Sequence, residues 1–234
     1  MVAPSVGNFL RRNVMELNNK IALVIGAGEI PGSSIAIELA RAGAKVVVEG
    51  SAGVQETVLR TVEKFGGDAL PIRGDMTIET DVRHVVDNIE AILGAVDIVV
   101  NVYPTISVGK LIEETPYDQW DQVYGNKIRA AFLSCKVLIP TMKRRGSGQI
   151  ISIGSSHLIG QNSGQTAITT SEYGIIGLSN SLAKELAGTG IKVLYISPVD
   201  HIESTQGEIL HGPDDTYDSF AKRVVLTTEQ NLSR

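Results

Sequence analysis

The chain has 234 residues, of which 43% are hydrophobic and 20% are charged, and its formal net charge is −5. This length and composition suit one globular domain with a large buried core. The acidic balance argues against nucleic acid and membranes as partners, because both attract basic surfaces. The single cysteine, Cys135, excludes an intrachain disulfide and a cysteine-rich metal site, so we expect no bound metal.

The beginning of the chain lacks the continuous apolar run of a secretory signal, and no later segment is long and apolar enough for a membrane span. We therefore expect a cytoplasmic protein. Residues 1–18 are predicted to be an N-terminal extension, and residues 19–234 are predicted to form a single domain.

Short runs of β-branched residues alternate with longer helical patterns along most of the chain. The predicted strands cover residues 21–24, 45–49, 69–73, 97–101, 149–153 and 192–196. The predicted helices lie near residues 32–43, 54–65, 79–93, 117–145 and 164–187. Such alternation indicates parallel strands joined by helical crossovers, with helices on both faces of the sheet. The fold class is therefore predicted to be α/β, a Rossmann-type doubly wound parallel sheet.

The predicted helix 164–187 carries the most informative pattern. Its segment QTAITTSEYGIIGLSNSLAKEL, residues 165–186, resembles a helix of the short-chain dehydrogenase/reductase (SDR) family in which a Tyr and a Lys are separated by three residues. The flanks match on both sides and place Ile168 at the Tyr position and Glu172 at the Lys position. The resemblance covers roughly residues 18–200 and implies the Rossmann fold of that family.

In the SDR family an Asn, a Ser, a Tyr and a Lys cooperate in proton transfer, and the resemblance places Lys127, Ser155, Ile168 and Glu172 at these four positions. An alkyl chain cannot donate a proton, and a carboxylate raises the pKa of a nearby phenol instead of lowering it. We therefore predict that none of the four is catalytic. Counting from Trp120 favours Lys127 for the Asn position, although a slip of one residue would place Asn126 there.

Lys127 and Glu172 have opposite charges at positions that face each other in the family. We hypothesise that they form a partly buried ion pair; the alternative is that both side chains turn to solvent. His157 is close to Ser155 in sequence, but two neighbours do not make a catalytic triad. Tyr173 lies about 140° around the helix from Ile168, so it is rejected as a displaced acid.

The dinucleotide-binding turn of the family departs from its usual pattern here. Gly26 and Gly32 keep the outer positions of a Gly-x-x-x-Gly-x-Gly spacing, which lets the backbone approach a pyrophosphate at a helix N-terminus. Ile30 takes the middle position and is expected to project into the space that a phosphate or ribose needs. Pro31 removes an N–H near the anion site.

The other expected cofactor contacts are also altered. The second predicted strand ends at Glu49, one residue before the position that meets the adenosine ribose in relatives. Asp75 keeps the adenine position, although an Asp after a strand is also ordinary turn chemistry. Asn101 keeps its position, but Tyr103 and Pro104 follow it where small residues leave room for adenosine. We predict that Gly26, Ile30, Gly32, Asp75 and Asn101 are vestigial and that this chain binds no cofactor.

The end of the chain is also short for the family. Residues 205–211 resemble either a last strand or the remnant of a lid, and residues 214–230 have a weak amphipathic helical pattern. Either interpretation predicts a truncated C-terminal lid over the substrate site.

Together these features predict a non-catalytic SDR subunit, not an enzyme by itself. It resembles the inactive subunits of heterotetrameric SDR dehydrogenases that act on an aromatic hydroxyacyl-CoA. The resemblance implies an active SDR paralogue as partner, with NAD in that partner, through helices 117–145 and 164–187, whose apolar surface covers more than one side. Two alternatives stay open: a divergent NAD(P)-dependent oxidoreductase, and a cofactor-independent lyase or hydratase using Ser155, His157 or Glu172.

Overall fold

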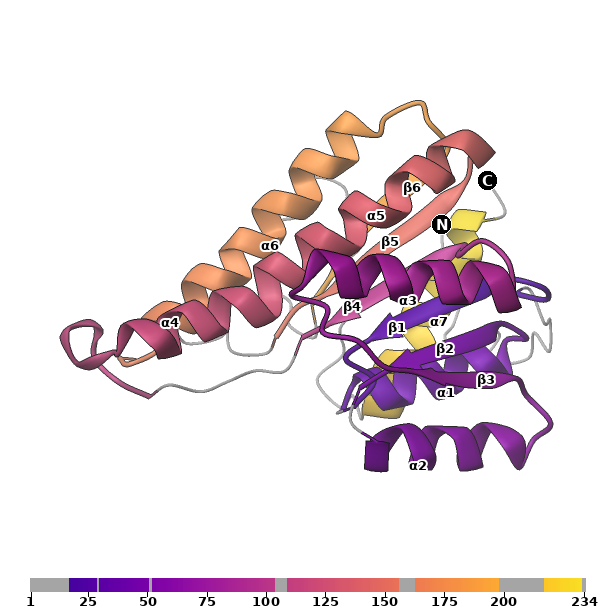
Figure 1. Ribbon diagram of the computed structural model, residues 1–234, viewed down its shortest axis with the longest axis horizontal. Helices are drawn as coiled ribbons and strands as arrows, with labels where there is room; N and C mark the ends of the chain where they lie inside the picture. The colour runs from indigo at the N-terminus through magenta and orange to yellow at the C-terminus, as the bar shows by residue number, and fades with distance from the viewer. Residues whose placement is uncertain are drawn as a thin grey trace, which may run out of the picture.

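The computed structural model describes residues 17–28, 30–50, 52–103, 109–155, 163–197 and 217–232. In this part of the chain six parallel strands form one sheet with the order β3-β2-β1-β4-β5-β6 (Figure 1). The strands are β1 (Ile21–Ile25), β2 (Lys45–Glu49), β3 (Ala69–Ile72), β4 (Ile98–Val102), β5 (Gly148–Ile153) and β6 (Ile191–Ile196). This order is that of a Rossmann sheet, which confirms the predicted fold class.

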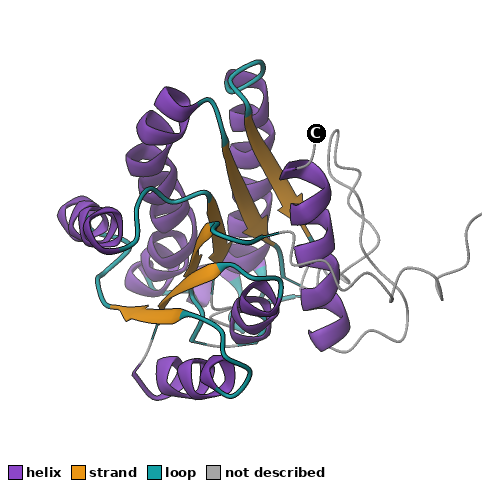
Figure 2. Ribbon diagram, turned by 90° about the vertical axis from the view of Figure 1, so that its right-hand side faces the viewer, coloured by secondary structure: helices purple, strands orange, loops and turns teal. Residues whose placement is uncertain are grey.

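Helices cover both faces of the sheet (Figures 1 and 2). They are α1 (Gly32–Arg41), α2 (Ala52–Glu63), α3 (Glu79–Ile92), α4 (Tyr117–Tyr124), α5 (Ala130–Arg145), α6 (Thr166–Glu185) and α7 (Tyr217–Leu232), with a short 3₁₀ helix η2 (Ile112–Glu114). One hydrophobic core joins the sheet to α3, α5 and α6, and a second joins it to α1, α2 and α7. Because each face has its own core, the central strands β1, β4 and β5 are buried throughout.

The predicted helix 117–145 is divided in the structure. A π-helical turn, η3 (Gly125–Arg129), separates α4 from α5. The backbone stays in the right-handed helical region on both sides, at Tyr124 (φ −67°, ψ −45°) and at Arg129 (φ −65°, ψ −44°). A π turn accommodates an extra residue within a helix, and here it contains the buried Lys127.

The two ends of the domain compare differently with the predicted boundaries. Leu17 is fully buried and its N–H donates to the carbonyl of Ala42 (3.1 Å), so the domain begins before residue 19. The predicted extension before it, residues 1–16, lies outside the described residues. At the other end α7 confirms the helix predicted near residues 214–230, and it packs against α1. The predicted strand or lid remnant at residues 205–211 lies outside the described residues.

None of the helices in the described residues has both the length and the apolar character needed to cross a bilayer. In the same part of the chain, the His, Cys, Asp and Glu side chains form no group of three that could hold a metal ion.

Candidate active site

A buried ion pair joins the π turn to α6. The ammonium of Lys127 donates a hydrogen bond to Oε1 of Glu172, and the two side chains are 5% and 0% exposed. This contact confirms the hypothesised ion pair and contradicts the alternative in which both side chains turn to solvent. It also places Lys127 of the π turn against α6, as expected if Lys127 takes the Asn position.

Ser155 and Ile168 complete the set of four predicted positions. Ser155 follows β5, and its backbone N–H donates to the second oxygen of Glu172, Oε2 (3.4 Å). Ile168 lies one helical turn before Glu172 on α6 and is 2% exposed, so hydrocarbon fills the position of the family's proton donor. The structure therefore places an ammonium, a carboxylate and the Ser155 backbone together, with Ile168 on the same buried face of α6.

The remaining tyrosine and histidine candidates have different outcomes. Tyr173 is 52% exposed, in agreement with the expectation that it points away from Ile168. His157 lies outside the described residues. Tyr195, which sequence reasoning missed, is buried on β6, and its hydroxyl lies where a Cβ at Gly154 would be. No local pattern marks it, because its place depends on the absence of a side chain on the neighbouring strand.

The turn between β1 and α1 retains two glycines that the backbone geometry requires. Gly26 has φ +75°, and a Cβ there would collide with the carbonyl oxygen of Val102. A Cβ on Gly32 would collide with the carbonyl oxygen of Gly26. The turn thus packs tightly against β4 and the first residue of α1. Both glycines are therefore required for the turn to pack at the N-terminus of α1, and a helix N-terminus is where a pyrophosphate binds in dinucleotide-binding folds.

Ile30 and Tyr103, the two side chains expected to obstruct the cofactor, have different surroundings in the structure. Ile30 is 58% exposed, so its side chain is not packed into the turn, and its expected projection into the cofactor space stays a prediction. Tyr103 is 7% exposed and packs in the core that joins the sheet to α3, α5 and α6. The prediction that Tyr103 crowds the adenosine site is wrong, because its ring points into the core. Pro104 lies outside the described residues.

Glu49 provides a carboxylate at the end of β2. Its Oε2 accepts the N–H of Gly26 (3.0 Å), 23 residues earlier, a separation typical of the acidic residue that binds the adenosine ribose. Burial raises the pKa of Glu49, the Gly26 N–H opposes this rise, and Asp75 adds to it. A raised pKa means that ionised Glu49 lowers stability above the usual carboxyl pKa. Because ionised Glu49 costs stability, its presence at this position is better explained by binding than by folding.

Asp75 and Asn101 both have structural partners. Asp75 Oδ1 accepts hydrogen bonds from the N–H (2.8 Å) and the hydroxyl (2.6 Å) of Thr77, which is the turn chemistry considered as its alternative role. Asn101 is fully buried, and its Oδ1 accepts from the hydroxyl of Ser134 (3.1 Å), so it ties β4 to α5.

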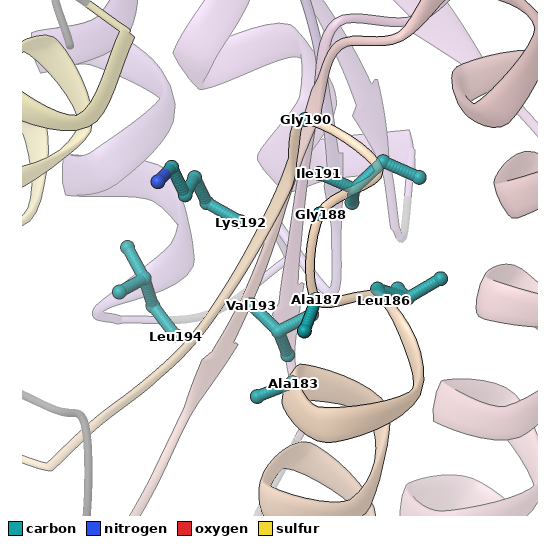
Figure 3. A pocket seen from close by; sticks show the side chains of 9 residues that line it. All are labelled: Ala183, Leu186, Ala187, Gly188, Gly190, Ile191, Lys192, Val193 and Leu194. Carbon is teal, nitrogen blue, oxygen red and sulfur yellow. The ribbon is translucent and has the colours of Figure 1, made fainter.

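A pocket of about 520 Å³ lies elsewhere, between the end of α6 and β6 (Figure 3). Its lining runs from Ala183 and Leu186 to Lys192, Val193 and Leu194. None of the ionisable groups described above lines it, so this pocket is separate from the candidate active site.

Comparison with known proteins identifies the family of the chain. The family model of short chain dehydrogenases matches residues 20–206. The chain belongs to the SDR family. This assignment confirms the resemblance that was drawn from the helix and turn motifs.

Three curated SDR relatives are between 31% and 32% identical to this chain. A short chain dehydrogenase of Pseudocercospora fijiensis is 31% identical, over 90% of this chain and 67% of the relative. The D-beta-hydroxybutyrate dehydrogenase of Rhizobium meliloti is 32% identical, over 76% of this chain and 70% of the relative. The 3-oxoacyl-[acyl-carrier-protein] reductase FabG of Salmonella typhimurium is 32% identical, over 79% and 74%.

Solved structures give the same fold. A metagenomic short-chain oxidoreductase in complex with NADP has a TM-score of 0.82 at 24% identity and covers 92% of both chains. An NAD⁺-bound xylitol dehydrogenase has a TM-score of 0.73 at 27% identity, covering 78% of this chain and 70% of its own.

These comparisons correct three predictions. The SDR relatives are named as dehydrogenases and a reductase, so the prediction of a non-catalytic subunit is wrong, and so is the prediction that the chain is not an enzyme. The prediction that this chain binds no cofactor is also wrong, since the chain belongs to a dehydrogenase family in which a relative of known structure, 27% identical, is NAD⁺-bound. Ile168 removes the family's usual proton donor, but proton transfer is not thereby excluded, because an ammonium and a carboxylate are in contact on the same helix face.

Proposed function

We propose that this SDR is an NAD(H)-dependent oxidoreductase that interconverts a secondary alcohol and a ketone, with Lys127 as the proton donor. The observation that carries this proposal is the buried Lys127–Glu172 pair at the family's catalytic position, with Ser155 attached to it. Two relatives are named for reactions of a 3-hydroxy acid and a 3-oxoacyl group, which favours a 3-hydroxyacyl or 3-oxoacyl compound as substrate.

The cofactor site of this proposal consists of the turn and Glu49. Gly26 and Gly32 would hold the pyrophosphate at the start of α1, and Glu49 would hold the adenosine ribose. A carboxylate at that point repels the 2′-phosphate of NADP, so NAD(H) is the preferred cofactor. When bound, the nicotinamide supplies or accepts the hydride.

Lys127 is the proton donor in the proposed reaction. In the reducing direction the oxygen of the substrate gains negative charge, and the ammonium of Lys127 gives it a proton. Glu172 balances the charge of the ammonium at a buried position, and a lysine ammonium, unlike a guanidinium, can lose its proton. Ile168 adds apolar surface that keeps the local dielectric constant low, which strengthens these interactions.

The test compares the wild-type protein with Lys127→Arg, using 3-hydroxybutyrate and 3-oxoacyl thioesters with NAD(H) and NADP(H). Arginine can keep the ion pair with Glu172 but does not release its proton, so kcat should fall about 10²-fold to 10⁴-fold. The affinity for NAD⁺, measured by calorimetry, should stay unchanged.

Three results of this test would count against the proposal. They are wild-type kcat in Lys127→Arg, a wild-type protein that binds neither dinucleotide, and turnover of substrate without any nicotinamide. The last result would favour the lyase or hydratase alternative.

We also propose that the chain assembles with a second SDR chain, a paralogue of this one, through α5 and α6, which lie side by side in Figure 1. Phe132 on α5 and Tyr173 on α6 support this, because these large side chains are 49% and 52% exposed. Native mass spectrometry of the complex from its own cells should show a mixed tetramer. A monomer, or a tetramer of this chain alone, would contradict the proposed partner.

A further inference from the structure

The side chain of Tyr195 lies on the face of the sheet that α5 and α6 cover. The side chains of β6 alternate between the two faces of the sheet: Figure 3 shows Ile191 and Val193 on the opposite side of the strand from Lys192 and Leu194. Tyr195 continues the series of Ile191 and Val193 and belongs to the same core as α5 and α6. It pairs with Ser152 of β5 in the sheet register and is 6% exposed.

The phenol of Tyr195 lies beside the end of β5, next to the residue whose N–H contacts Glu172. A Cβ on Gly154 would collide with the Tyr195 hydroxyl, so the hydroxyl lies directly beside the residue that precedes Ser155. The N–H of Ser155 in turn donates to Oε2 of Glu172 (3.4 Å). Three ionisable side chains from three elements therefore lie near one another: Lys127 of η3 and Glu172 of α6, which are in contact, and Tyr195 of β6, whose hydroxyl is next to Gly154.

The Tyr195 hydroxyl is buried without a hydrogen-bond partner among the described residues. A phenylalanine would fill the same space without leaving a buried polar atom unsatisfied, so the hydroxyl calls for a reason other than packing. Burial, and then the Glu172 carboxylate, raises the pKa of Tyr195. Ser197 offsets part of this rise without meeting the phenol in hydrogen-bond geometry. The phenol thus keeps its proton at neutral pH and is available as a donor.

We propose that Tyr195 is a positioning residue whose hydroxyl becomes the donor to Glu172 after Lys127 has passed its proton to the substrate. This inference rests on the proposed function. In the step an N–H bond of the Lys127 ammonium breaks and an O–H bond forms on the substrate oxygen, which leaves a neutral amine. Glu172 remains an anion and has then lost its cationic partner. A buried carboxylate without a partner is strongly unfavourable, and the Tyr195 O–H can rotate to replace the lost interaction.

The first test is Tyr195→Phe, which removes only the hydroxyl. Hydrogen bonds to charged groups are strong enough that kcat should fall about 10-fold to 100-fold, with KM little changed. The thermal midpoint should be unchanged or higher, because an unpartnered buried hydroxyl is removed. A merely structural tyrosine would instead leave kcat at the wild-type value, and that result would overturn the proposal.

Tyr103→Phe is the matched control for this substitution. Tyr103 is buried to the same degree (7% exposed), and its hydroxyl also has no partner among the described residues. Its ionisable neighbour is the Cys135 thiol and not Glu172. The control should keep the wild-type kcat, and an equal loss in both variants would assign the effect to packing.

A second test is independent of turnover and separates this inference from the proposed function. In a Lys127→Met background, Glu172 has no ammonium, so adding Tyr195→Phe should lower the thermal midpoint. In the wild type and in the Lys127→Met/Glu172→Gln double variant it should not. If Lys127→Met does not fold, the phenol pKa of Tyr195, followed by ¹³C NMR of labelled tyrosine, should fall in the double variant because the carboxylate is gone.

The outcomes of the two tests distinguish the two proposals. A wild-type protein without hydride transfer removes the proposed function, and the stability comparison still decides whether Tyr195 supports Glu172. An active wild type whose Tyr195→Phe variant has normal kcat keeps the proposed function and overturns the role of Tyr195.

Discussion

Lys127→Met should lower the free energy of unfolding by about 3–5 kcal/mol, whereas Lys127→Met/Glu172→Gln should recover most of that loss. The single substitution leaves the carboxylate of Glu172 fully buried and opposite a thioether, and among the described residues the Ser155 N–H is then its remaining donor. The double variant removes both charges, and two uncharged side chains of similar size can occupy the space.

Urea denaturation of the single and double variants measures the effect, and an exposed ion pair provides the control. Glu56 and Arg60 on α2 form an i,i+4 pair with side chains 61% and 72% exposed. Glu56→Gln should change the free energy of unfolding by no more than about 1 kcal/mol, because water already solvates both groups. If the single and double variants at 127 and 172 lose equal stability, the ion pair is not the cause.

The sheet could be predicted from the sequence because its strands are buried on both faces. Continuous β-branched runs such as Val46–Val48 have no polar face, so their extent in the sequence marks the extent of the strand. The split of the predicted helix 117–145 could not be found this way. Residues Tyr124 and Arg129 keep helical dihedral angles, and the π turn differs only in which carbonyl each N–H meets.

The ion pair was predictable because it joins two family positions whose charges changed together. The direction of Tyr103 could also have been found: Val99, Asn101 and Tyr103 alternate with buried residues of the other core, so Tyr103 continues the face that packs on α5. The size of Tyr103 suggested that it obstructs the adenosine site, but the alternation of side chains along the strand already places its ring in the core. Tyr195 had no such signal, since its contact depends on Gly154 across the sheet.

Function was the least predictable property, for a physical reason. The absence of Tyr and Lys at 168 and 172 shows that the family's usual relay is missing, but not that proton transfer is impossible. Other ionisable groups can lie beside the same position, as the buried Lys127 of η3 does through its contact with Glu172. Residue identity at fixed positions therefore underdetermines the chemistry of a site.

Gly26→Ala tests the cofactor turn and should have the second large effect. At φ +75° an alanine is strained by about 1–2 kcal/mol, and its Cβ also meets the Val102 carbonyl. Overpacking against a rigid strand adds about 1–3 kcal/mol, so a total loss of about 2–5 kcal/mol is expected in urea denaturation. Because relief requires the turn to move away from β4, NAD⁺ affinity should fall at least about 10-fold, measured by calorimetry.

Gly66→Ala separates the two contributions to this effect. Gly66 has the same φ of +75°, and nothing lies within 4 Å of a Cβ built on it. Its replacement should therefore show the conformational strain alone, about 1–2 kcal/mol, with full NAD⁺ affinity. If Gly26→Ala loses no more stability than Gly66→Ala and still binds NAD⁺ normally, the turn is not held against Val102. The pyrophosphate must then contact other backbone, and the assignment of Gly26 to the cofactor site fails.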